Sequence, residues 1–250
     1  MRKLLCASLS LILAGVVACP AEAADRDAAL NIINKAIKAH GGEDALAKAK
    51  LATRTGEGQM TIVKDEVPFT DTITLSLPDR FKLALDVGKG QNKYKVALVL
   101  NGNKGWQATG GMVVELSAGR VAELREEAYR LWIMTLLPLK KETGFTLDTL
   151  PEIKVEGAVV AGVKISMRGH EDAKLYFSKK TGLLVKMERK TKELGLNVDK
   201  EYLFSSYKDY DGLKLPSKLV EMTNERKSIE IKVKSYKFPK KIDDSEFGKP

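Results

Sequence analysis

The sequence predicts a single α+β domain, in which helices cover the apolar face of a long, curved antiparallel sheet. Apolar residues recur at helical spacing near the N-terminus and then alternate with polar residues, which is the spacing of strands. Turn signals such as Asn101-Gly102, Thr181-Gly182 and Asp211-Gly212 join successive strands as hairpins. No linker rich in Pro, Gly or Ser interrupts this pattern, so we expect one domain.

The first helix is predicted over residues 25–38, where Leu30, Ile33 and Ile37 share one face. His40-Gly41-Gly42 then ends it, because glycine readily adopts the left-handed backbone that follows a helix. A short second helical segment is expected over residues 43–50.

Alternation predicts ten to eleven strands, each with one buried face. The segments that carry it are 72–77, 81–87, 94–100, a strand beginning at Trp106, 112–116, 163–167, 172–178, 183–192, 202–207, 213–222 and 229–238. In the last segment the apolar residues change from odd to even positions after residue 233, which predicts a β-bulge near Ser235.

A further helix is predicted between the two groups of strands, from Ala118 to Leu137, with Ser117 as its N-cap and Pro138 as its end. Residues 131–139 of this segment carry no charge. A helix that is apolar all round must be buried on more than one side or face an apolar ligand.

Composition excludes several classes of protein. The chain has 250 residues, of which 44% are hydrophobic and 30% charged, so it is neither a disordered tail, a collagen nor a polytopic membrane protein. It has two cysteines, both in the first 19 residues, and two histidines. A disulfide scaffold and a Cys/His zinc site are therefore excluded, and we expect neither a metal nor a cofactor.

The N-terminus has the features of a signal peptide. Arg2 and Lys3 precede an uncharged stretch over residues 4–18, which is too short for a comfortable membrane span. Ala21-Glu22-Ala23 is a small-x-small cleavage pattern. We therefore expect a signal peptide over residues 1–23, a mature domain over residues 24–250, and a periplasmic or secreted protein.

A second interpretation of the N-terminus stays open. Val16-Val17-Ala18-Cys19 resembles a bacterial lipobox, in which Cys19 would be lipidated. The protein would then be an outer-membrane lipoprotein anchored at Cys19.

The sequence lacks the usual catalytic motifs. It has no nucleophile elbow, no P-loop and no G-x-G-x-x-G between a strand and a helix. His40 is expected at a helix end and His170 on the surface. Asp209, Asp211, Asp243 and Asp244 are near turns, so a carboxylate-based hydrolase is a minor alternative to solvated turn residues.

The net charge of +9 is spread along the chain. The most basic local run holds Lys186, Arg189, Lys190 and Lys192, and an anionic lipid surface or an acidic partner would suit it. Nucleic acid is not expected as a partner of an exported chain.

The strongest specific feature is apolar. Either the inserted helix closes a core against the sheet, or the two enclose a cleft that takes acyl chains. The residues predicted to line such a cavity are Phe81, Trp106, Trp132, Ile133, Leu136 and Phe177.

Several local phrases resemble the bacterial lipoprotein-carrier superfamily of LolA and LolB, in particular its outer-membrane lipoprotein-sorting branch. They are Lys38-Ala39-His40-Gly41-Gly42, Val99-Leu100-Asn101-Gly102 with Gly105-Trp106, Leu175-Tyr176-Phe177 followed by Thr181-Gly182-Leu183-Leu184, and Ile242-Asp243-Asp244-Ser245-Glu246-Phe247 with Pro250.

The resemblance implies an unclosed β-barrel with an N-terminal helix and lid helices inserted into the barrel. It also implies a non-catalytic carrier that holds acyl chains of lipids or lipoproteins and meets the membrane surface transiently, as a monomer. The arginine that grips the lid in the carriers has no clear match here, since Arg54 and Arg80 are both on candidate strands. The alternative is an envelope protein-interaction or stress-sensor module with a closed core and a protein partner.

Overall fold

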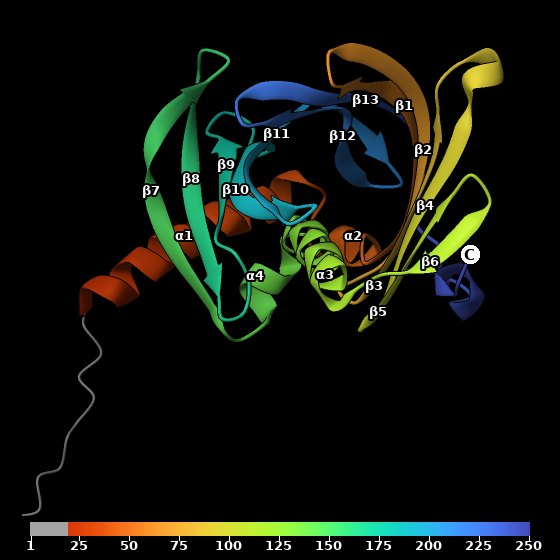
Figure 1. The fold of residues 1–250 in the computed structure, drawn as a ribbon. Helices are drawn as coiled ribbons and strands as arrows, with labels where there is room; N and C mark the ends of the chain where they lie inside the picture. Colours follow the sequence, from red (N-terminus) through yellow and green to blue (C-terminus); the bar gives the residue numbers. More distant parts are fainter. Residues whose placement is uncertain (1–19) are drawn as a thin grey trace, which may run out of the picture.

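The computed structural model describes residues 20–250, in which one antiparallel sheet of thirteen strands curves around the helices (Figure 1). The strand order is β6-β5-β4-β3-β2-β1-β13-β12-β11-β10-β9-β8-β7. Each strand pairs with the next strand in the sequence, except that β6 and β7, which flank α3 and α4, do not pair. The first strand, β1, pairs with the last strand, β13. The edge strands β6 and β7 are not paired with each other, so the barrel is unclosed, as predicted.

The strands alternate in direction and are joined mainly by tight turns. They are β1 (Leu51–Ile62), β2 (Asp65–Ser76), β3 (Arg80–Val87), β4 (Tyr94–Asn101), β5 (Lys104–Thr109), β6 (Met112–Glu115), β7 (Phe145–Val155), β8 (Ala158–Met167), β9 (Ala173–Ser178), β10 (Leu184–Glu193), β11 (Leu196–Tyr210), β12 (Leu213–Thr223) and β13 (Arg226–Lys237). The predicted hairpins at Gly102, Gly182 and Gly212 are present, each with a positive φ.

Two strands, β1 and β7, are additional to the predicted set. In β1 the positions that face inward include Arg54, Gly56 and Gly58. The strand therefore lacks the alternation of apolar and polar residues from which the neighbouring strands were predicted. In β7 the pairing shifts between Leu150 and Ile153, which changes the phase of the apolar residues. The bulge expected near Ser235 is confirmed, because Ser235 pairs with Thr55 and Val233 pairs with Gly56.

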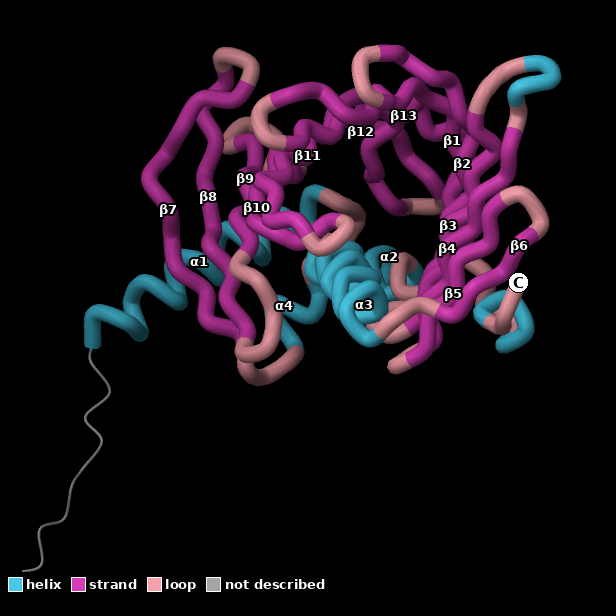
Figure 2. Tube along the Cα trace, viewed as in Figure 1, coloured by secondary structure: helices cyan, strands magenta, loops and turns pink. Residues whose placement is uncertain are grey.

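The helices lie together on the concave side of the sheet and along its lower rim in the view of Figure 2. They are α1 (Pro20–Ala39), α2 (Glu43–Lys48), α3 (Ala118–Ile133) and α4 (Leu137–Lys141). Single turns of 3₁₀-helix occur over Gly90–Asn92 and, as η2, over Asp244–Phe247. None of the helices in the described residues is long and apolar enough to cross a membrane.

The inserted helix is shorter than predicted. Ser117 caps α3 as expected, but the helix ends at Ile133 rather than Leu137. Leu136 has a φ of 65°, which breaks the helical backbone. Pro138 is therefore in the first turn of α4, where its missing N–H has no helical acceptor to bond, rather than at the end of α3.

Two apolar clusters form the core. The larger cluster joins α1, α4 and the end of α3 to β7–β12, and its buried members include Ile33, Ile133, Leu147 and Leu175. The smaller cluster packs the first half of α3 against β3 and β4 through Phe81, Leu100, Val121, Leu124 and Ala128. The part of the sheet between these two clusters is where the site lies.

Most of the predicted signal peptide, including Cys19, lies outside the described residues. The boundary at residue 23 and the lipidation of Cys19 therefore stay predictions.

Candidate functional site

A cavity of about 260 Å³ lies between the concave face of the sheet and the helices α2 and α3. Its walls come from β1–β3 and β11–β13 on the sheet side. They are mainly aliphatic, with contributions from Leu46, Ala49, Met60, Phe69, Leu75, Leu83, Leu85, Leu131, Met134, Leu215, Leu219, Ile229 and Ile231. A concave site with apolar walls and few polar groups is the usual form of a small-molecule site.

The sheet register explains why these side chains meet. Ile73 on β2 pairs with Leu83 on β3, which in turn pairs with Leu98 on β4, so the three form an aliphatic row on one face. Across β1, Gly58 pairs with both Phe69 and Ile231. A Cβ at Gly58 would clash with the backbone oxygen of Glu230 and lie 2.9 Å from the Phe69 ring, so only glycine fits between the strand and this ring.

Much of the cavity wall is only partly buried. Leu83, Leu85, Leu219 and Ile231 are all half-buried, whereas Ile133, Leu147 and Leu175 of the larger cluster have at most 1% of their surface exposed. Apolar side chains inside a finished core are normally fully buried. The wall residues thus retain apolar surface that a ligand can cover.

Polar side chains interrupt the apolar wall at two places, the Arg54–Asp71 pair on β1 and β2 and the charged group that includes Glu127, Arg130 and Glu221. Arg54 of β1 forms an ion pair and hydrogen bond with Asp71 of β2, and the Asp71 side chain is 2% exposed. Burial raises the pKa of Asp71, and the nearby Arg54 charge only partly offsets this. Tyr236 of β13 pairs with Arg54 in the register, and burial raises the pKa of its phenol to about 12.

A second charged group fixes α3 to the sheet. Glu127 on α3 accepts hydrogen bonds from Arg130, one turn along the same helix, and from Arg189 on β10 at 2.8 Å. Arg189 also donates to the backbone oxygen of Glu126 at 2.9 Å. Burial raises the pKa of Glu127, but the charges of Arg130, Arg189 and Lys200 outweigh it, so the net shift is downward.

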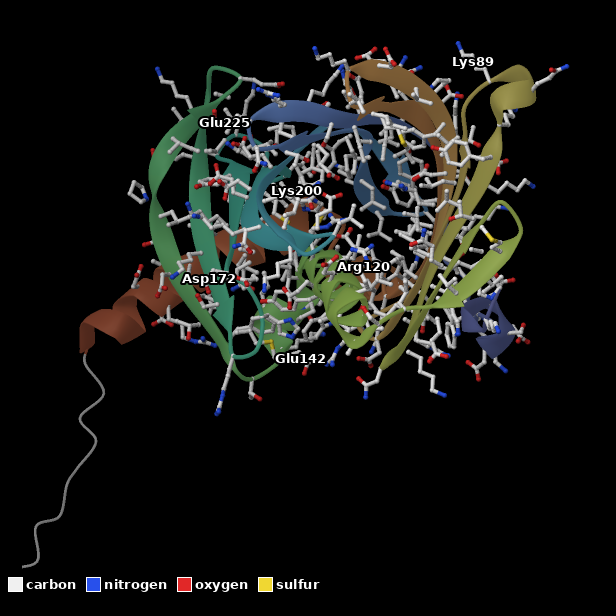
Figure 3. The ribbon with its side chains drawn as sticks, in the orientation of Figure 1. Lys89, Arg120, Glu142, Asp172, Lys200 and Glu225 are labelled. Atoms are coloured by element: carbon white, nitrogen blue, oxygen red, sulfur yellow. The ribbon has the colours of Figure 1, made fainter. Side chains whose placement is uncertain are left out.

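Lys200 adds a further charge beside this network from β11 (Figure 3). It is nearly buried and binds Glu221 at 2.5 Å and Glu193 at 2.8 Å. Arg130 in addition lies 4.5 Å over the ring of Tyr202. The contacts of Glu126 and Glu127 with Arg189 and of Arg130 with Tyr202 hold the middle of α3 in one position over the cavity.

The structure places the six predicted cavity residues beside the cavity rather than along its walls. Ile133, Leu136 and Phe177 are buried in the larger cluster, with Trp132 packed against it. Phe81 is buried in the smaller cluster, and Trp106 is half-buried on β5. Their contact with a ligand stays a prediction.

On the same helix, Leu131 and Met134 do line the cavity, one position from Trp132 and Ile133. Leu131 and Met134 thus face the cavity, while Trp132 and Ile133 face the larger cluster.

The other candidate groups have structural partners. Asp211 pairs with Lys48 and Asp244 with Arg80, while the Asp209 carboxylate accepts from the Gly212 amide in the turn. Asp243 caps the η2 turn by accepting from the Ser245 amide. The four carboxylates thus order turns and loop contacts.

The two histidines differ from each other. His40 is 5% exposed at the end of α1, with Nδ1 2.8 Å from the Ala36 oxygen. Burial lowers the pKa of His40. His170 was expected on the surface but is half-buried, stacked on Tyr129 at 3.9 Å and bonded to Glu126 at 2.8 Å.

The basic run is not a continuous basic surface. Arg189 is buried against Glu127, and Lys186 pairs with Glu188 and Glu201, so only Lys190 and Lys192 are exposed. An anionic lipid surface would therefore meet two of the four predicted charges at this place.

No protein-family model matches the chain, and no curated protein matches it. Solved structures do share its fold. A LolA superfamily protein from Nitrosomonas europaea is 10% identical, with a TM-score of 0.54 over 82% of this chain and 96% of that one. A domain from Vibrio parahaemolyticus named for outer membrane lipoprotein sorting is 13% identical, with a TM-score of 0.55 over 89% and 97%. A DUF1329 family protein from Desulfovibrio piger is 13% identical, with a TM-score of 0.56 over 90% and 96%.

The fold that the local phrases predicted is confirmed by these structures. The chain has the fold of LolA superfamily proteins, an unclosed antiparallel barrel with helices on its concave side. At 10–13% identity the likeness concerns the fold.

Proposed function

We propose that the protein is a non-catalytic carrier or binder of acyl chains, which it holds in the cavity between the sheet and α3. The observation that carries this proposal is the row of half-buried aliphatic side chains on a concave wall. Covering such surface is favourable by about 25 cal/mol per Å². The source of the chains is proposed to be lipids or lipoproteins of the bacterial envelope, met in the periplasm.

The fold supports this assignment, since proteins with the same architecture include one named for outer membrane lipoprotein sorting. The carboxylates considered for hydrolysis support it too, because Asp209, Asp211, Asp243 and Asp244 are engaged in turns and loop contacts away from the cavity walls.

The test is a pair of tryptophan substitutions on β3. Leu83 faces the cavity, and its neighbour Ala84 projects from the opposite face of the same strand. Leu83→Trp fills the cavity, and we expect it to weaken binding of the neutral dye N-phenyl-1-naphthylamine, and of acyl ligands that displace it, at least tenfold. Ala84→Trp adds the same side chain outside and should leave binding unchanged.

Circular dichroism and urea unfolding of both variants establish that each is folded. If the folded wild-type protein binds neither the dye nor an acyl ligand, the carrier proposal is wrong and an envelope protein-interaction module with a closed core takes its place. Equal binding by wild type and Leu83→Trp would show that acyl chains are held elsewhere.

A further inference from the structure

The ion pair inside the cavity has unused hydrogen-bonding capacity. Arg54 Nε and Asp71 Oδ1 have no hydrogen-bond partner, and they are two of the four buried atoms in this condition among the side chains that the structure describes. Both residues line the cavity. A buried polar atom without a partner costs free energy, and a ligand that supplies the partner recovers it.

The space next to Asp71 is kept free by a glycine. Gly56 on β1 pairs with Asp71 on β2. A Cβ at Gly56 would lie 2.5 Å from Asp71 Oδ1 and 2.9 Å from a methyl carbon of Ile231, so any larger residue would crowd this oxygen. The neighbours of Asp71 on the inward face are Phe69 and Ile73, which offer no hydrogen bond.

The charge of the pair restricts the ligand. Arg54 and Asp71 neutralise each other, so the pair has no net charge with which to balance an ionised head group. The other charged residues that line the cavity, Glu127, Arg130 and Glu221, are each engaged with a partner of opposite charge. A carboxylate would face Asp71, and an ammonium group would face Arg54. Burying an uncompensated charge is far more costly than burying a hydroxyl or an amide that is hydrogen-bonded.

The burial of the Arg54–Asp71 pair also disfavours an ionised head group. Burial raises the pKa of Asp71 despite the adjacent Arg54, because it disfavours the charged form of the carboxyl group. The only other titratable group that pairs with Arg54 across the sheet is Tyr236, whose raised pKa, about 12, keeps it neutral.

We propose that Arg54 and Asp71 anchor the head group of a single-chain amphiphile that is uncharged and both donates and accepts hydrogen bonds, such as a long-chain alcohol, a monoacylglycerol or a primary amide. The head group donates its O–H or N–H to Asp71 Oδ1 and accepts from Arg54 Nε. Its chain lies against the aliphatic wall. At about 260 Å³ the cavity is just below the roughly 300–1,000 Å³ of typical ligand pockets, which suits one chain.

This inference rests on the proposed function, because the apolar wall must first accept the chain. It adds a preference for the head group, which a purely apolar cavity does not have. Absence of any acyl binding would contradict the proposed function, whereas binding without a head-group preference would contradict only the anchor. One set of ligands distinguishes these outcomes.

The experiment compares ligands with the same twelve-carbon chain by their displacement of N-phenyl-1-naphthylamine from the wild-type protein. The ligands are 1-dodecanol, dodecanamide, dodecyl methyl ether, dodecanoate and dodecyltrimethylammonium, all below their micellar concentrations. We expect the alcohol and the amide to bind at least tenfold more tightly than the ether, which cannot donate, and than the two ions.

The double variant Arg54→Met/Asp71→Leu tests the anchor directly. Replacing a buried ion pair by apolar residues of similar volume often preserves the fold. We expect this variant to lose the preference for the alcohol, so that the alcohol and the ether displace the dye from it equally well. The matched control is Arg80→Met/Asp244→Leu, which removes a second Arg–Asp pair that is outside the cavity walls and should keep the preference.

If none of the five ligands displaces the dye, the proposed function fails. If all five displace it but the alcohol and the ether bind equally to the wild-type protein, the chain site stands and the anchor is wrong. Preference for the alcohol that survives in a folded Arg54→Met/Asp71→Leu protein would also overturn the anchor. The wild-type ligand series decides the matter even if the double variant does not fold.

Discussion

The two halves of this sheet are built from similar strands but reach different degrees of burial. In the packed half, β7–β10, the concave face is covered by α1, α4 and the end of α3, and residues such as Leu147 and Leu175 are fully buried. In the hollow half, β1–β3 with β12 and β13, the facing elements are α2 and one side of α3, and residues such as Leu83 and Ile231 stay half-buried. Helix placement, rather than strand composition, thus separates a core from a cavity.

Matched leucine truncations should show the largest difference between the halves. Leu147→Ala removes a side chain that is 1% exposed in the packed half, and we expect a loss of about 3 kcal/mol or more in the free energy of unfolding. Leu83→Ala makes the same change on the half-buried wall and should cost about 1 kcal/mol, because the cavity already exists there. Urea unfolding measures both, and equal losses would show that the hollow half is packed as tightly as the other.

The charged network that fixes α3 over the hollow half should give the next largest effect. Glu127→Gln leaves Arg130 and Arg189, both 8% exposed, without their shared carboxylate. Removing one partner of a buried pair typically costs about 3–5 kcal/mol, and the partial exposure of Glu127 places this loss toward the low end. Hydrogen exchange should locate the loss in α3.

The same network predicts a pH dependence. The pKa of Glu127 is lower in the folded protein than its usual value of 4.5. Its contribution to stability is therefore complete above pH 4.5 and is lost as the pH falls through the folded pKa. The slope of stability against pH in this acid range should be shallower in Glu127→Gln, and an unchanged slope would mean that Glu127 does not stabilise the fold through its charge.

The smallest effect is expected where the two halves meet. Glu43 at the start of α2 pairs with Lys140 at 2.6 Å and Lys141 at 2.8 Å on α4, and these partners lower the pKa of Glu43 to about 2. This exposed contact should stabilise the protein slightly above pH 4.5 and be lost between pH 4.5 and 2. NMR titration of the Glu43 carboxyl checks the pKa, and a midpoint near 4.5 would show that α2 and α4 are not linked by charge.

Much of the fold could be predicted from the sequence because local rules govern it. Asn101-Gly102 and Asp211-Gly212 specify hairpins through glycine at positive φ, and Ser117 specifies a helix start through its side-chain oxygen. Residues 51–62 were not predicted as a strand because their inward positions include Arg54, Gly56 and Gly58. Where polar residues and glycines replace apolar residues on the inward face, the periodic signal of a strand disappears.

The candidate site could be predicted only in part. The sequence predicts an apolar helix that faces an apolar sheet. It does not distinguish whether Ile133 and Leu136 belong to a closed core or to the wall of a cavity, and the structure places both in the larger cluster. The pairing of Arg54 with Asp71 depends on the diagonal register of β1 and β2, for which no local pattern exists.

The sequence by itself therefore determined most of the strands, the turns and the antiparallel order, since each follows from spacing and from the conformational preferences of a few residues. Only the tertiary structure decided which apolar faces are closed and which enclose space. That outcome depends on where a break of a few residues at Leu136 directs α3 and α4, and on which strands they then cover. Whether a side chain is buried depends on which other elements pack against it, and those elements come from distant parts of the chain.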